Sequence, residues 1–291
     1  MKIIIKKCRT RGRHGFGEVV LYFILLGLVL AGFLIYRENN SLALSHYQIK
    51  SKKISRSLKI CQISDFHNHD HRGFQEKLYQ AICQEDPDYI FITGDLVDSR
   101  KTKPEVTLNF LKRLVAHYPC YYVSGNHEHR VKDLEKIHQA YLDLGIHILD
   151  NESLVLEEGL VLHGLQDPRS QGRGLSKQDM ENYYRKLLDQ ESFDPQAYQV
   201  LLVHRPDFLS LFASYPLDLV LAGHLHGGQI RLPILGPLLS PYGEFFPKGA
   251  QGMQKLKKTR QITSRGLGNS SFPIRINNPP DLVVVSLERE K

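Results

Sequence analysis

Aspartate, asparagine and histidine residues recur in this sequence directly after short apolar segments, often beside a glycine. In chain order, the set is Asp65, His67, Asp95, Asn126, His127, His204, His224 and His226. Such residues are common in loops, so each alone is ordinary. Together they offer carboxylate oxygen, amide oxygen and imidazole nitrogen, which suit Mn, Fe or Zn better than Ca or a thiolate zinc site. The ligands outnumber the needs of one tetrahedral ion, so two ions that share a ligand are the simplest interpretation.

The apolar segments before these residues are predicted to be strands that alternate with amphipathic helices. Strands are expected at 59–64, 89–93, 120–124, 154–156, 160–163, 199–204, 217–222 and 282–287, and helices at 74–85, 105–116, 131–142, 176–189 and 206–212. This order predicts α/β layers with mixed sheets. Because ligands of open α/β sheets collect at the carboxyl ends of strands, we expect the polar residues to surround one point.

The motifs resemble those of the calcineurin-like metallophosphoesterases over roughly residues 57–288. The family pattern D-x-H, G-D, G-N-H-[D/E], H and G-H-x-H is matched at every element, with Phe66 where Leu is more usual and Glu128 where Asp is common. A membrane-associated bacterial subgroup, of phosphodiesterases and UDP-2,3-diacylglucosamine pyrophosphatase-like enzymes, is the most similar. The segments that carry this closer resemblance are ISDFH (63–67), ITGDLVD (92–98), GHLHGGQIRLP (223–233) and SRGLGNSSFPIR (264–275).

The resemblance implies a four-layer α/β/β/α sandwich with two mixed sheets and a metal-dependent hydrolase of phosphoric esters. It implies two divalent metal ions, with Mn favoured over Fe or Zn. One ion would be held by Asp65, His67, Asp95 and His226, and the other by Asp95 as the bridge with Asn126, His204 and His224. A hydroxide between the ions would attack phosphorus. His127 would assist the leaving group, and Asp98 would orient His127.

The N-terminal region predicts a membrane anchor. Between Glu18 and Arg37 run 18 uncharged residues, about 27 Å as a helix and close to the thickness of a bilayer core. We expect a basic cytoplasmic tail (1–18), a transmembrane helix (19–36), a linker (37–57) and the catalytic domain (58–291). Basic residues packed into positions 1–13 favour a cell-membrane protein with its catalytic domain outside the cytoplasm. A small-x-small site at Ser41–Ala43 leaves signal-peptide cleavage open.

The net charge of +7 is concentrated in the tail, because the 255 residues after position 36 hold 32 basic and 30 acidic groups. That balance does not predict a nucleic-acid partner. The apolar segment Ile230–Phe246 is either a buried loop or an exposed lip that meets a bilayer or an acyl chain. Arg130 and Arg205, next to motif residues, are either surface charges or phosphate contacts.

The favoured hypothesis is a phosphodiester or pyrophosphate substrate linked to lipid. Two alternatives stay open: a protein or nucleotide phosphomonoesterase that uses the same site, and a catalytically silent anchored scaffold. A silent relative is expected to have lost a ligand, and here every expected position is filled. The sequence predicts no oligomeric state.

Overall fold

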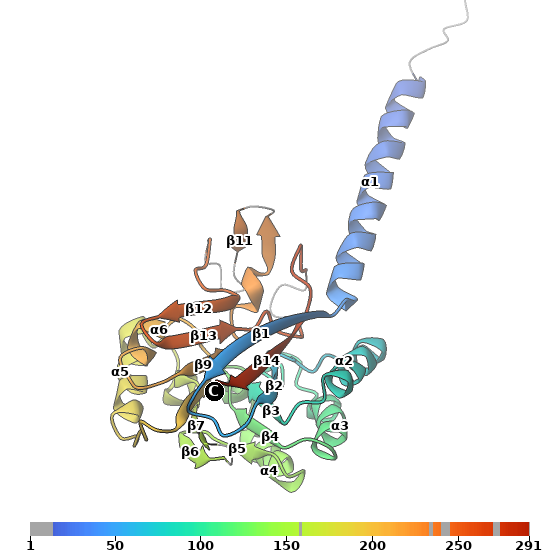
Figure 1. Ribbon diagram of the computed structural model, residues 1–291. Coiled ribbons are helices and arrows are strands. Elements are labelled where there is room, and N and C mark those ends of the chain that lie inside the picture. The colour runs from blue at the N-terminus through green and yellow to red at the C-terminus, as the bar shows by residue number, and fades with distance from the viewer. Residues whose placement is uncertain (1–13, 157–158, 233–234, 240–244, 270–273, 291) are drawn as a thin grey trace, which may run out of the picture. The chain divides into compact units, whose positions relative to one another are not determined.

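The computed structural model describes residues 14–156, 159–232, 235–239, 245–269 and 274–290 (Figure 1). The chain divides into an N-terminal segment, Met1–Arg37, and a compact unit, Glu38–Lys291. Helix α1 (His14–Asn40) contains a segment, Gly17–Asn40, that is long and apolar enough to cross a membrane, with a mean hydropathy of 2.7. A signal sequence would have the same properties. The basic residues expected to orient the anchor, at positions 1–13, lie outside the described residues.

Two six-stranded mixed sheets form the compact unit, with the strand orders β1-β14-β2-β3-β4-β5 and β12-β13-β9-β8-β7-β6. The strands of the first are β1 (Ala43–Ser51), β2 (Leu58–Ile63), β3 (Tyr89–Thr93), β4 (Cys120–Val123), β5 (His147–Ile148) and β14 (Asp281–Arg289). Those of the second are β6 (Glu152–Val155), β7 (Leu160–Leu165), β8 (Tyr198–Val203), β9 (Leu219–Ala222), β12 (Gly252–Leu256) and β13 (Thr259–Thr263). Strands β10 (Ile230–Leu232) and β11 (Gly236–Leu239) form a separate antiparallel hairpin.

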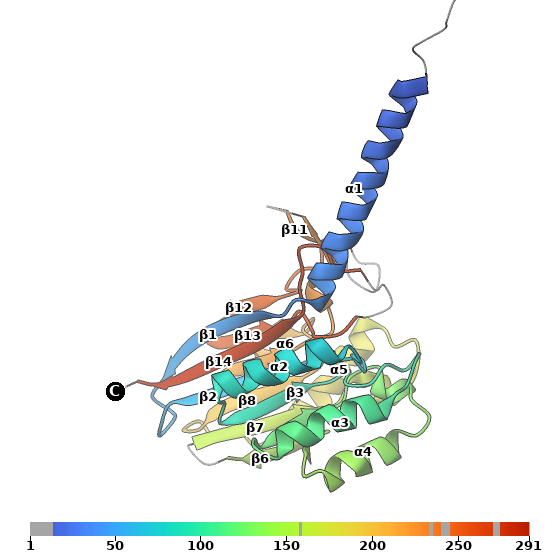
Figure 2. The ribbon, with the colours of Figure 1, turned by 90° about the vertical axis from the view of Figure 1, so that its right-hand side faces the viewer.

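Helices cover the outer faces of both sheets, which gives the expected four layers (Figure 2). Those packed on the first sheet are α2 (Arg72–Glu85), α3 (Pro104–Val115) and α4 (Leu134–Asp143), and those on the second are α5 (Lys177–Leu188) and α6 (Leu209–Phe212). Short 3₁₀ turns lie at η1 (Glu128–Arg130), η3 (Pro168–Gln171) and η4 (His226–Gly228). The α/β/β/α fold class inferred from the sequence is confirmed.

Central strands are apolar on both faces because each face packs on a different layer. In β3, Phe91 belongs to the core between the sheets, whereas Ile90 and Ile92 pack under the helices. In β8, Val200 faces the other sheet and Leu201 faces α5 and α6. Such strands appear in a sequence as continuous apolar runs, which is why they could be predicted.

The parallel strands bring the site motifs to one edge. β2, β3 and β4 are parallel neighbours in the first sheet, and β8 and β9 are parallel neighbours in the second. Parallel neighbours end on the same side, so the residues that come after these five strands gather where the sheets face each other.

One prediction about this unit was wrong. Residues 37–57 were expected to be a linker, but β1 (Ala43–Ser51) lies within them and pairs in parallel with β14. Only Ile49 of this edge strand is fully buried, so its sequence lacks the apolar run that marks the central strands. The hairpin β10–β11 and strands β12 and β13 were not predicted either.

Candidate metal centre

The loops after β2, β3 and β9 have an unusual backbone. Asp65, His67, Asp95, His224 and His226 all have positive φ angles, between 46° and 73°. Residues with a Cβ rarely adopt this left-handed conformation, and its strain persists only where the surrounding structure enforces it. Such strain clusters at functional sites, so the backbone itself marks these loops as a candidate site.

The side chains of the first expected ligand set converge. His226 Nε2 lies 3.3 Å from Asp65 Oδ1 and 3.2 Å from His67 Nε2. His67 Nε2 lies 3.7 Å from Asp95 Oδ2. Atoms bound to one ion at about 2.1 Å lie roughly 3–3.5 Å apart, so these separations fit a shared cation.

The second expected set adjoins the first through Asp95. His204 Nε2 lies 3.3 Å from Asp95 Oδ2 and 3.2 Å from His224 Nδ1. One arm of the Asn126 amide lies 2.8 Å from His224 Nδ1. If this arm is the amide oxygen, it and His224 Nδ1 are two acceptors that face each other, as ligands of one cation do. If the arm is the amide nitrogen, it donates a hydrogen bond to the ring instead.

The candidate ligands fit a metal ion, because one of their oxygens, Asp95 Oδ2, has no hydrogen bond from the described residues that would satisfy it. Asp95 Oδ2 is buried and has no hydrogen bond of good geometry with any described residue. Three ring nitrogens nevertheless face it, from His204 at 3.3 Å, His67 at 3.7 Å and His127 at 4.0 Å. A buried carboxylate oxygen costs free energy unless it is paired, and a cation among these nitrogens would pair it.

Two glycines allow the loops to approach so closely. A Cβ on Gly125 would overlap Asp95 Oδ1, and one on Gly223 would overlap Ser64 Oγ and Asp65 Oδ2. A larger residue at either position would therefore push a candidate ligand out of place.

The histidines differ in their protonation. Burial lowers the pKa of His67 to about 3 and that of His224 well below its usual value, so both rings are neutral, as metal ligation requires. Burial would also lower the pKa of His204, but the carboxylates of Asp95 and Asp65 raise it to about 10. Without a metal ion, a proton on His204 thus supplies the positive charge beside Asp95 and Asp65 that a bound cation would supply.

Hydrogen bonds outside the cluster orient the ligands. His204 Nδ1 donates to Thr93 O at 2.8 Å, which turns Nε2 toward Asp95. Ser64 Oγ donates to Asp65 Oδ2 at 2.6 Å. Neither Ser64 nor Thr93 was singled out in the sequence. The contact of Thr93 with His204 is visible only once the ends of β3 and β8 are placed together.

Glu128 ties two of the loops together, a role that its place in the motif did not reveal. Its fully buried carboxylate accepts from the amides of Asp95 at 2.9 Å, Val97 at 3.1 Å and Gly125 at 3.0 Å. Burial and the nearby Asp95 raise the pKa of Glu128 to about 8, whereas the three donors favour its charged form. This side chain fixes the spacing between the ends of β3 and β4.

His127 and Asp98 lie together at the edge of the cluster. His127 Nδ1 is 3.3 Å from Asp98 Oδ1 and 3.2 Å from the Ser99 amide. When His127 Nδ1 carries a proton, it donates to Asp98. When Nδ1 carries no proton, it accepts from the Ser99 amide. Burial would lower the pKa of His127, but Asp95 and Asp98 together raise it above its usual value.

Comparison with known proteins gives the family. The family model of the calcineurin-like phosphoesterases matches residues 58–228. The chain is 29% identical over 269 residues to the metallophosphoesterase YkuE of Bacillus subtilis, covering 88% of this chain and 89% of YkuE. It is 31% identical over 284 residues to the metallophosphoesterase Cj0846 of Campylobacter jejuni, covering 93% and 71%. Phosphodiesterase YaeI of Escherichia coli is 26% identical over 213 residues, covering 70% and 72%.

The chain therefore belongs to the calcineurin-like phosphoesterase family, and it is a metal-dependent hydrolase of phosphoric esters.

Proposed function

We propose that the protein is a membrane-anchored hydrolase of diesters of phosphate or pyrophosphate, with two divalent cations at the two ligand sets. The ligands are those inferred from the sequence: Asp65, His67, Asp95 and His226 for one ion, and Asp95, Asn126, His204 and His224 for the other. The observation that carries the proposal is the unsatisfied Asp95 Oδ2, around which ring nitrogens from both sets converge. Manganese is the expected ion, with iron or zinc as alternatives, since both ligand sets offer carboxylate, amide and imidazole groups without thiolate.

When bound, the two cations would act as Lewis acids toward the phosphoryl group and make water a nucleophile near neutral pH. Asp95 would contribute to both sets and offset the repulsion between two positive ions. His127 would use Nε2 as a proton donor to the leaving oxygen, while Asp98 accepts from Nδ1 and orients the ring. The raised pKa of His127 supports a donor role.

A diester is favoured because cavities open on both sides of the cluster. One, of about 320 Å³, is lined by His67 and Asp98 on the side of His127. The other, of about 270 Å³, is lined by His224 and Arg205. A diester has two substituents to accommodate, whereas a monoester has one. The likeness to phosphodiesterase YaeI agrees with this preference.

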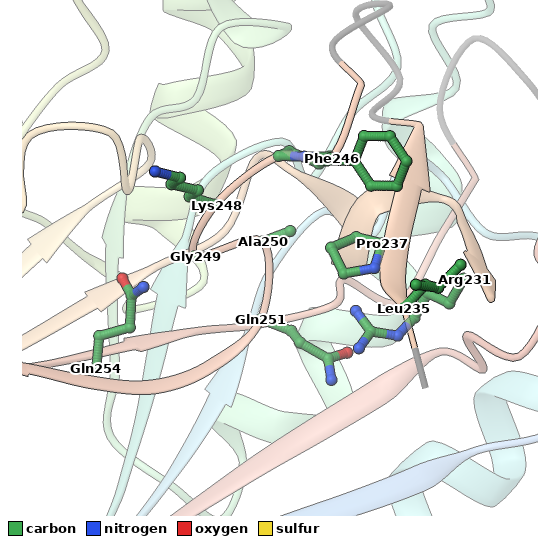
Figure 3. Close-up of a pocket in the computed structure, with 10 residues that line it drawn as sticks. Arg231, Leu235, Pro237, Phe246, Lys248, Gly249, Ala250, Gln251 and Gln254 are labelled. Carbon is green, nitrogen blue, oxygen red and sulfur yellow. The ribbon is translucent and has the colours of Figure 1, made fainter. Parts of the chain in front are cut away.

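An amphiphilic substrate is supported by an apolar surface at the hairpin β10–β11, here called the lip: Leu235, Pro237, Phe245 and Phe246. Leu235, Phe245 and Phe246 are 67%, 72% and 55% exposed. Figure 3 shows Leu235, Pro237 and Phe246 around a cavity of about 470 Å³, with the cations of Arg231 and Lys248 at its margin. Apolar side chains beside cations suit a lipid surface with anionic headgroups.

The lip adjoins the loop that carries His226. Arg231 Nη1 donates to Gly227 O at 2.9 Å, and Gly228 lies against Pro237 and Pro247. A lipid-linked phosphate held at the lip would therefore lie next to the loop of a candidate ligand. Positions 233–234 and 240–244, within the apolar segment singled out in the sequence, lie outside the described residues.

The test compares bis-p-nitrophenyl phosphate with p-nitrophenyl phosphate, using metal-stripped full-length protein with and without added Mn. We expect hydrolysis of the diester to return with the metal and to exceed that of the monoester. Preference for the monoester would support the phosphatase alternative, and bound metal without any hydrolysis would support the scaffold. Extraction of native membranes with alkaline carbonate tests the anchor: release of the protein would contradict a spanning helix and favour cleavage.

A further inference from the structure

The cavity beside the second ligand set has basic and apolar walls. Its volume is about 270 Å³, and its lining includes His224, Arg205, Lys177, Met180 and Phe208. Because His224 is one of its walls, a group held in this cavity would lie next to the reacting phosphoryl group.

A buried carboxylate holds Arg205 in the wall of this cavity. Arg205 Nε donates to Asp167 Oδ2 at 2.7 Å, and Nη2 lies 3.4 Å from Oδ1. Asp167 is fully buried, and its Oδ1 also accepts from the amide of Arg169 at 2.8 Å. A guanidinium fixed along one edge presents its remaining donors in a set direction, the arrangement that binds phosphate oxygens well.

Arg205 also reaches the metal cluster, since its Nη1 lies 3.0 Å from His224 Nε2. A guanidinium can only donate, so this contact needs a lone pair on Nε2. The arginine therefore lies between a buried carboxylate and a candidate metal ligand, in the wall of the cavity.

Positive charge accumulates on this side of the cluster. Arg169 lies close enough to Arg130, Arg173 and Arg205 to interact electrostatically with each of them. Arg130 Nη2 lies 3.3 Å from the amide of the candidate ligand Asn126. Among the residues that line the cavity itself, the cations Arg205 and Lys177 outnumber the one carboxylate, Asp207. A simple phosphodiester has one negative charge, fewer than this surface can accommodate.

We propose that this cavity is a subsite for a second anionic group of the substrate, next to the reacting phosphoryl group, and that Arg205 contacts it. A second phosphate has the charge and the oxygen geometry that the Arg205 fork would bind. Met180 and Phe208 would pack against an apolar part of the substrate beyond that second group. This inference rests on the proposed function, because it assigns a further group to the same substrate.

Calorimetry measures the binding of inorganic pyrophosphate and of phosphate to full-length protein in detergent, and so tests the subsite. The protein is metal-free, so that neither probe can chelate a bound ion. We expect wild type to bind pyrophosphate more tightly than phosphate. Arg205→Met should weaken pyrophosphate binding about ten- to a hundredfold, and Arg205→Lys, which keeps the charge without the fork, should be intermediate. Lys177→Met, which leaves the buried Asp167 paired, should weaken it severalfold. The control Arg185→Met, on an exposed pair with Glu181, should bind like wild type.

Two results would overturn the subsite. One is that wild type does not prefer pyrophosphate to phosphate, and the other is that Arg205→Met and Lys177→Met both bind pyrophosphate as tightly as wild type does. Neither depends on hydrolysis. Failure of the proposed function would instead appear as no metal-restored cleavage of bis-p-nitrophenyl phosphate by wild type.

Discussion

At the scale of single residues, His127 lies between two carboxylates with a ring nitrogen toward each. Its Nδ1 is 3.3 Å from Asp98 Oδ1, and its Nε2 is 4.0 Å from Asp95 Oδ2. Its ring could therefore either bind metal or deliver a proton, and we assign it the second role.

Replacing His127 with Gln separates these two roles. A proton donor matters most when the leaving group is poor, so we expect a loss of about 10²–10⁴-fold in kcat with diphenyl phosphate. The loss should be much smaller with bis-p-nitrophenyl phosphate, because p-nitrophenolate leaves readily. Metal content should equal that of wild type. Loss of a metal ion, or equal losses with both esters, would contradict the proton-donor role.

Glu128→Gln tests whether one buried carboxylate fixes the loops after β3 and β4. Both oxygens of the carboxylate accept from backbone amides, but the glutamine side chain has one oxygen and an NH₂ group that cannot accept. We therefore expect the free energy of unfolding to fall by about 2–4 kcal/mol. The exposed Glu135→Gln is the matched control, with an expected change within about 0.5 kcal/mol. Urea unfolding measures both variants, and equal stabilities would show that Glu128 is not structurally required.

Residue type and order were enough to predict which candidate ligands come together, because each follows an apolar strand that could be recognised. The contact of Glu128 with the amide of Asp95 and the pairing of Arg205 with Asp167 could not be predicted in the same way. They depend on distances between loops far apart in the chain, such as that from Arg205 to Asp167. Their residue types are equally common on solvent-exposed surfaces.

At the scale of elements, the apolar central strands were predictable, whereas β1 and the hairpin β10–β11 were not. β1 has one fully buried residue, and β10 and β11 have only half-buried ones. Strands are recognised in a sequence mainly by their pattern of apolar residues. Edge strands and hairpins with few buried positions have a weak pattern of this kind.

The lip is the element whose function can be tested by substitution. Leu238 and Leu239 are half-buried in β11, so the exposed Leu235 and Phe246 are the better positions. We expect Leu235→Ser with Phe246→Ser to reduce hydrolysis of a phospholipid in vesicles by about tenfold, because apolar contact with lipid is lost.

Hydrolysis of bis-p-nitrophenyl phosphate by this double variant should remain within about twofold of wild type, since a small diester does not need the lip. An equal loss with both substrates would mean that the lip supports the fold of the site rather than contact with lipid.

At the scale of the whole molecule, the chain joins an apolar helix to a catalytic unit of the calcineurin-like family. The helix could be predicted because eighteen uncharged residues are rare outside membranes and buried cores. The catalytic unit could be predicted because five strand-end motifs occur in one order. The proposed number of ions depends on the assembled site, since Asp95 would have to serve both ligand sets at once.

Metal content per chain, measured by elemental analysis of full-length protein equilibrated with Mn, tests the central claim most directly. Wild type should bind about two ions, and Asp95→Asn at most about one, with loss of hydrolysis, because the shared carboxylate is removed. The exposed Asp133→Asn should match wild type. One ion per wild-type chain, or two ions and near-normal turnover in Asp95→Asn, would contradict a two-metal centre bridged by Asp95.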